Sequence, residues 1–119
     1  IARERTDHET PQARYERAQA LYRQVGDVLG EANCIRSVGD IASAEAHRDD
    51  AVSSYQAALA LYQRIAGAYS IGDTYCQLAR LATDEDSRAA HVTAAREAWR
   101  SIKRDDLIAI LDAEFGGAE

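Results

Sequence analysis

A pattern that returns after 40 residues limits the fold of this chain more than any other feature of its sequence. Small and aromatic residues recur at matching positions: Tyr15 and Tyr55, Ala18 and Ala58, Ala20 and Ala60, Leu21 and Leu61, Tyr22 and Tyr62, Ala42 and Ala82. The same offset aligns Ile1–Ala2 with Ile41–Ala42, so we expect the chain to begin inside an earlier copy. Self-similarity at this period is typical of a solenoid, in which stacked units bury one another's apolar faces.

Within each copy, apolar residues recur every three or four positions, which is the period of an amphipathic α-helix. One run passes through Ala32, Ile35, Val38 and Ala42, and a second through Ala51, Tyr55, Ala58, Tyr62 and Ile65. A short polar turn at 47–50 separates the two runs, so the two helices form a hairpin. Alanine dominates the hydrophobic residues and is the best helix former, whereas strands need more β-branched residues. The sequence therefore predicts an all-α fold.

We expect five main helices and a capping helix. The main helices have predicted ranges 11–25, 28–46, 49–66, 70–82 and 87–103, and the cap runs from Leu107 to a stop at Gly116–Gly117. Thr10 is the predicted N-cap of the first helix and Pro11 fits its first position, while Gly26 ends it. The fifth helix is expected to present four residues to the core: Val92, Ala95, Trp99 and Ile102. The result is a single domain, with a partial repeat at 1–28, repeats at 29–68 and 69–104, and the cap at 105–119.

These residues resemble the pattern of a known family. Ile35-x-x-Val38-Gly39-x-x-Ala42, followed by Ala51-x-x-x-Tyr55-x-x-Ala58-Leu59, is similar to the tetratricopeptide repeat (TPR) motif. The second copy keeps Tyr75, Leu78, Ala82, Ala95, Ala98 and Trp99 but departs from the motif at Ala79 and His91. The period of 40 exceeds the usual value of about 34 and resembles the kinesin light chain and Pins-like branches of the family. The resemblance implies a right-handed superhelical solenoid of antiparallel helix hairpins with a concave binding face.

The resemblance also implies which residues line that face, because in the family it carries the first helix of each hairpin. They are Asn33, Arg36, Ser37 and Asp40 in one copy and Asp73, Cys76, Gln77 and Arg80 in the next. Such a mixture of donors and acceptors suits the binding of an extended peptide. Arg36 and Arg80 either bind a ligand carboxylate in bidentate fashion or are solvated charges paired locally. We therefore predict a non-catalytic scaffold that binds a partner peptide or helix on its concave face.

Two other roles remain open. The helix at 11–25 presents Tyr15 and Tyr22 on an apolar face for which the sequence offers no earlier complete hairpin. A second copy would cover such a face in a dimer or an end-to-end stack, so a homo-oligomer is an alternative prediction. The array is alternatively the regulatory arm of a larger signalling ATPase or transcription regulator.

Charge and hydropathy argue against two classes of partner. The net charge of −6 and the pI of about 5.0 do not fit a surface that follows nucleic-acid phosphates. No apolar run approaches the roughly 20 residues that cross a bilayer, so we predict no membrane partner. Cys34 and Cys76 are expected to be buried free thiols in a reducing, cytoplasmic compartment, with a bridge between adjacent hairpins as the alternative.

The sequence also gives no sign of an enzyme. No motif supplies a nucleophile or an acid–base pair, so we expect no catalytic residues and no cofactor. The acidic turn at 83–87 lacks the central Gly of a calcium loop and is predicted to cap a helix, and no other spacing indicates a metal site. His91 replaces a small residue of the motif, so we expect a partly buried structural histidine. Trp99 is predicted to be a core or end-cap residue rather than a ligand platform.

Overall fold

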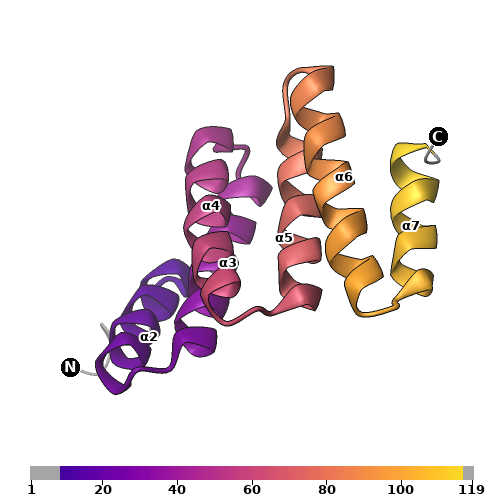
Figure 1. The fold of residues 1–119 in the computed structure, drawn as a ribbon. Coiled ribbons are helices and arrows are strands. Elements are labelled where there is room, and N and C mark those ends of the chain that lie inside the picture. The colour runs from indigo at the N-terminus through magenta and orange to yellow at the C-terminus, as the bar shows by residue number, and fades with distance from the viewer. Residues whose placement is uncertain (1–8, 117–119) are drawn as a thin grey trace, which may run out of the picture. The chain divides into compact units, whose positions relative to one another are not determined.

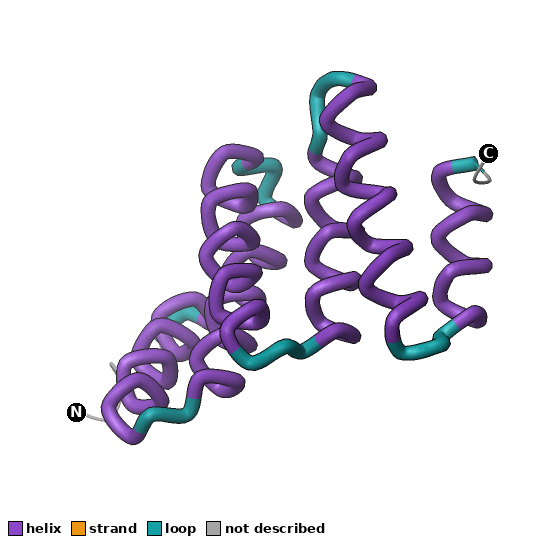
Figure 2. Tube along the Cα trace, viewed as in Figure 1, coloured by secondary structure: helices purple, strands orange, loops and turns teal. Residues whose placement is uncertain are grey.

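The computed structural model describes residues 9–116, which form six helices and no strand (Figures 1 and 2). The helices are α2 (Pro11–Val25), α3 (Val28–Ala44), α4 (Arg48–Arg64), α5 (Ala68–Leu81), α6 (Glu85–Ser101) and α7 (Asp105–Phe115). The all-α class is therefore confirmed for this part of the chain. The expected end of an earlier helix at Ile1–Asp7 lies outside the described residues. None of the described helices is long and apolar enough to cross a membrane.

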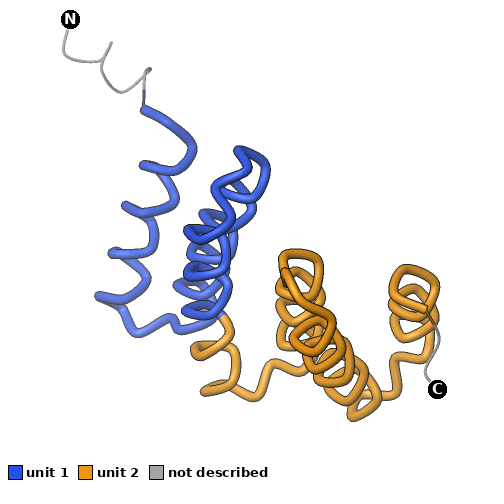
Figure 3. The backbone as a smooth tube through the Cα atoms, turned by 90° about the horizontal axis from the view of Figure 1, so that it is seen from above, with its two compact units in different colours: residues 1–58 blue, residues 59–119 orange. Residues whose placement is uncertain are grey.

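The chain divides into two compact units, residues 1–58 and 59–119, and the boundary lies within α4 (Figure 3). In the first unit, α2 begins as predicted. The Thr10 hydroxyl accepts a hydrogen bond from the backbone N–H of Ala13 at 3.1 Å, and Pro11 occupies the first position. Gly26 ends the helix in the left-handed conformation, with φ 78°. The helix boundaries of α2 thus follow directly from local sequence.

Close contacts at glycine join the helices of the first unit. A Cβ atom placed on Gly30 of α3 would lie 2.5 Å from the ring of Tyr22, so α2 and α3 meet at a position that has no room for a side chain. Gly39 of α3 allows the same kind of close contact with α4, since a Cβ atom placed on it would lie 3.0 Å from the Tyr55 ring. The Tyr55 hydroxyl donates a hydrogen bond to Asp40, and Tyr55 is only 1% exposed. Small residues fill the remaining contact: Ala32, Ala42, Ala51 and Ala58.

In the second unit, α5 and α6 lie side by side, and α7 packs against α6 (Figure 1). Their core consists of Cys76, Ala79, Val92, Ala95, Trp99 and Leu111. The Trp99 ring covers Gly72, where a Cβ would approach within 2.6 Å of ring carbons, and its Nε1–H donates to the Tyr69 carbonyl at 3.1 Å. The prediction that Trp99 is a core residue is confirmed. The prediction that Ile102 faces inward is wrong: this residue follows the last residue of α6, Ser101, and is 40% exposed.

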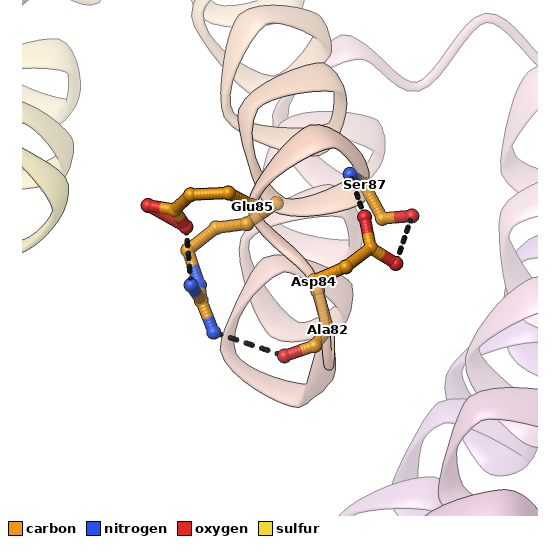
Figure 4. A network of polar contacts seen from close by, with 5 residues as sticks. Ala82, Asp84, Glu85 and Ser87 are labelled. Atoms are coloured by element: carbon orange, nitrogen blue, oxygen red, sulfur yellow. Dashed lines mark hydrogen bonds and ion pairs between the residues drawn. The ribbon is translucent and has the colours of Figure 1, made fainter.

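Four helices begin one or two residues before their predicted starts: α4 at Arg48 rather than Asp49, α5 at Ala68 rather than Ser70, α6 at Glu85 rather than Ser87, and α7 at Asp105 rather than Leu107. The acidic turn does cap α6, because the Asp84 carboxylate accepts hydrogen bonds from the Ser87 N–H at 2.7 Å and its hydroxyl at 3.1 Å (Figure 4). Arg88 then connects Glu85 to the Ala82 carbonyl. These hydrogen bonds from Ser87 lower the pKa of Asp84, so the cap is charged at neutral pH.

The ends of α2, α4 and α6 share one geometry. Each is followed by a residue with positive φ: Gly26 at 78°, Ala66 at 52° and Lys103 at 58°. The next N–H bonds back to the carbonyl of an aromatic residue: Tyr22 at 2.9 Å, Tyr62 at 3.0 Å and Trp99 at 3.0 Å. The spacing is therefore 40 residues and then 37, because α5 has 14 residues where α3 has 17. Trp99 thus corresponds to Tyr62 and not, as the constant offset implies, to Leu59.

Candidate binding surfaces

The predicted row on α3 lies along one helix face, because its four residues have the spacing i, i+3, i+4 and i+7. Asn33 and Asp40 are exposed, and Arg36 and Ser37 are partly buried. Asp40 accepts the hydroxyl hydrogen bond of Tyr55, so this carboxylate helps to fix α4 against α3. Asn33 and Arg36 also have interactions within the chain. The row therefore contains exposed polar side chains, several of which already interact with other residues of the chain.

The predicted row on α5 requires one correction. Cys76 is 5% exposed and lies in the core, so it does not line an open surface. The reason is its spacing from Gly72 and Ala79, which places it on the side of α5 that packs against α6. Burial raises the pKa of its thiol, which favours the unreactive protonated form. Asp73 and Gln77 are partly buried, and Arg80 is exposed.

Arg80 is already bound to a carboxylate of the same chain. Its Nε and Nη2 atoms donate to the two carboxylate oxygens of Glu114 in α7, at 2.7 and 2.8 Å. This arrangement is the bidentate geometry expected for a ligand, but it is a local pair. The hydrogen bonds from Arg80 lower the pKa of Glu114 below its usual value. Because the side chains are 45% and 36% exposed, the pair contributes at most about 1 kcal/mol to stability.

A second arginine, which the sequence did not single out, also holds α7. Arg96 of α6 donates to Asp112, and its side chain is 12% exposed. On the same helix, Leu111 is 1% exposed and belongs to the core cluster, against which Leu107, Ile108 and Phe115 also pack. Helix α7 is thus anchored by a buried leucine and oriented by two arginines. The available signal was the composition of α7, which has four carboxylates and no basic residue.

The first unit carries a groove that sequence reasoning missed. Two adjoining hollows, of about 330 and 250 Å³, share Glu16, Val38, Ser53 and Ser54. Residues of α2, α3 and α4 line them, and Glu45, His47 and Asp50 complete the larger hollow. Its carboxylates suit a basic group rather than an acidic one. No periodic pattern predicts this groove, because it depends on the angle between α2 and its neighbours.

The second unit has a shallower and more apolar groove between α5 and α6. Its volume is about 470 Å³, and its lining includes Ile71, Tyr75, Ala94 and Ala98. The nearby His91 ring lies 5.9 Å from the ring of Tyr75. His91 is partly buried, as expected, and desolvation lowers its pKa, so it is neutral at pH 7.

The most exposed apolar surface lies on α2 and the start of α3. Its members are Tyr15 (39% exposed), Leu21 (58%), Tyr22 (39%), Val25 (77%) and Leu29 (50%). None of the residues of α2 is buried in the described part of the chain. Apolar side chains exposed together on one helix are candidates for a contact with another protein.

Within residues 9–116, no group of three or more His, Cys, Asp and Glu side chains is arranged to hold a metal ion. Cys34 and Cys76 are both buried free thiols. Comparisons with protein-family models, with curated proteins and with solved structures found no match to this chain.

Proposed function

We propose that this chain is a non-catalytic protein-interaction scaffold, a TPR-like solenoid that binds a carboxylate-bearing peptide or helix. One observation carries the proposal: the α5–α6 hairpin already holds an acidic amphipathic helix, α7, through Leu111, Arg80 and Arg96. A surface that accepts such a helix within the chain has the groups needed to accept one from a partner.

The apolar contact and the ion pairs of α7 contribute differently to recognition. Burial of one leucine side chain contributes roughly 1.5–3 kcal/mol, so Leu111 supplies most of the attraction. The arginines contribute less energy but set orientation, since each pairs with a carboxylate at a fixed distance along the helix. The partner predicted by this pattern is an amphipathic helix in which a leucine precedes carboxylates one and three positions later.

The α3 row is a separate candidate surface in the first unit. Its Asn33 amide suits hydrogen bonds to a peptide backbone, and Arg36 is the arginine of this row. The net charge of −6 opposes long-range attraction of an acidic partner, so the arginines act only at contact distance. Binding is therefore expected to be modest in affinity and slow in association.

A labelled peptide with the sequence of residues 104–116 tests the proposal. The receptor is the full chain carrying Leu111→Ala, which loosens its own α7 and opens the surface. We expect fluorescence anisotropy to detect binding, and Arg80→Glu in the same background to weaken it by up to about fivefold, since the partly exposed pair contributes at most about 1 kcal/mol. Arg36→Glu tests the α3 row in the same way.

Arg100→Glu is the matched control, because Arg100 is exposed on α6 and the substitution changes the net charge equally. Circular dichroism establishes that each variant keeps its helices. If the folded Leu111→Ala chain does not bind the peptide, or if Arg80→Glu and Arg100→Glu bind it equally, the proposed surface is wrong.

A further inference from the structure

The groove of the first unit lies between three helices, each of which contributes one side to it. Its two hollows are lined by positions 12, 16 and 19 of α2, positions 35, 38 and 42 of α3, and positions 50, 53, 54 and 57 of α4. All of them belong to one compact unit. Steps of three and four residues keep each set on one face of its helix. Seven residues of helix rise about 10 Å, so the groove is about as long as three residues of extended chain.

The two hollows differ in chemistry. The larger hollow, of about 330 Å³, has three carboxylates in its lining, those of Glu16, Glu45 and Asp50. The smaller hollow, of about 250 Å³, adds the apolar side chains of Ile35 and Ala57. The groove therefore has an acidic end and a more apolar end.

Arginine does not neutralise the carboxylates of the larger hollow within residues 9–116. Glu16 accepts a hydrogen bond from the neutral amide of Gln12 at 3.1 Å, and neither Glu16 nor Asp50 has an ion pair there. Glu45 lies 3.5 Å from the Nδ1 atom of His47, which also lines this hollow. Among the described residues, no Lys or Arg side chain lines either hollow. A cation in this hollow therefore meets carboxylates from α2, from α4 and from the end of α3.

The groove of the second unit shows which part of this chemistry recurs. Tyr75 and Ala94 line it, and they correspond to Ile35 and Ala57 at the repeat intervals of 40 and 37 residues. Its lining is mainly apolar, with Glu97 as its acidic residue in the described chain. The apolar part is therefore common to both repeats, whereas the group of three carboxylates belongs to the first unit.

We propose that the groove of the first unit binds an extended segment of a partner protein in which a basic residue lies close to an apolar one. The ammonium or guanidinium group of the basic residue lies among the three carboxylates of the larger hollow, and its methylene groups cover Val38. The apolar residue occupies the smaller hollow against Ile35 and Ala57. Side chains two positions apart in an extended chain point to the same side, about 7 Å from each other, so this spacing fills both hollows.

The charge of the whole chain favours such a partner. A net charge of −6 attracts a basic segment at long range, whereas it opposes the approach of an acidic helix to the α5–α6 hairpin. The three carboxylates are exposed, so each ion pair with the ligand contributes little by itself, and the contacts act together. Because salt screens exposed charges, binding is expected to weaken as the ionic strength rises.

An NMR titration of the full, ¹⁵N-labelled chain tests the proposal. The probe is a blocked peptide of Gly and Ser that carries one Leu and, two positions later, one Arg. We expect the peptide to shift the backbone amide signals of the groove residues. Replacing its Arg by Gln is expected to weaken binding about tenfold, since three weak ion pairs are lost together. Replacing its Leu by Gly is expected to weaken binding as well, because the smaller hollow is then empty.

Two substitutions in the chain test the two ends of the groove. Asp50→Asn is expected to weaken binding by up to about fivefold. Its matched control is Asp49→Asn, because Asp49 lies in the same first turn of α4, is 96% exposed and is outside the groove. Ala57→Leu fills the smaller hollow and is expected to remove the advantage of the peptide that carries Leu. Ala60→Leu is the control for that change, since Ala60 is exposed on α4 outside both hollows.

Circular dichroism checks that each variant is folded, and Glu16→Gln replaces Asp50→Asn if the latter loses helicity. The proposal is wrong if the peptide shifts no groove signal, if the Arg and Gln peptides bind equally, or if Asp50→Asn and Asp49→Asn bind the peptide equally. A failure here leaves the proposed function untouched, because that test uses an acidic peptide and the α5–α6 hairpin of the second unit.

Discussion

Two glycines show how single atoms set the spacing of these helices. A Cβ on Gly72 would lie 2.6 Å from the carbons of Trp99, whereas a Cβ on Gly39 would lie 3.0–3.2 Å from Tyr55 and Ser54. The distance at Gly72 is shorter than two carbon atoms can approach, so the indole of Trp99 must shift. At Gly39, the neighbouring side chains need to move by only a few tenths of an ångström. The same substitution therefore has different consequences at the two sites.

We expect Gly72→Ala to lower the free energy of unfolding by about 1–3 kcal/mol, the usual cost of overpacking a core contact. At Gly39, Ala gains about 1 kcal/mol of helix propensity that offsets most of the strain, so Gly39→Ala is expected to be nearly neutral. Gly39→Leu, which adds a whole side chain against Tyr55, should cost about 2 kcal/mol or more. Urea unfolding measures all three. Equal midpoints for the two Ala variants would show that the Trp99 contact is not tight.

At the scale of helices, α7 depends on its buried leucine more than on its ion pairs. Leu111→Ala is expected to lower stability by about 2–5 kcal/mol, since Leu111 is 1% exposed in the core of the second unit. Glu114→Gln is expected to cost at most about 1 kcal/mol, because the Arg80 pair is partly exposed. Chemical unfolding with far-UV circular dichroism compares the two. A larger loss for Glu114→Gln would mean that charge, not burial, holds α7.

Helix boundaries were predictable where local chemistry sets them. Thr10, Pro11 and Gly26 bound α2 because an N-cap, a preset φ and a left-handed residue act within a few positions. The change of the repeat period from 40 to 37 residues was not visible in the sequence, because the second copy is rich in alanine. Ala95 and Ala98 match the first copy by chance in the wrong register. Alanine fits nearly every helical position and so fixes none.

The candidate site was less predictable than the fold. The spacing places four residues on one face of α3, but it does not say which face of α5 packs inward, and Cys76 proved to be core. The Arg80–Glu114 pair joins residues 34 positions apart and depends on the packing of α7 against α6. Periodicity describes each helix alone, whereas a binding surface is a property of several helices together.

At the scale of the whole molecule, association and stability are linked. The sequence predicts a homo-oligomer, as one alternative, through the exposed apolar residues of α2, and a contact that forms only between folded copies stabilises the folded state by mass action. The melting temperature of the unmodified chain is therefore expected to rise with protein concentration. Each tenfold excess of protein over the dissociation constant adds about 1.4 kcal/mol.

Calorimetric or dichroism melts across a wide concentration series measure this dependence. Tyr15→Glu is expected to melt at a temperature independent of concentration, because it places a charge on the exposed apolar surface of α2. Ala90→Glu should retain the dependence of the unmodified chain, since Ala90 is exposed on α6 and is not part of the α2 surface. If the unmodified chain melts at one temperature at all concentrations, folding and association are independent and α2 is stable with its apolar side in water.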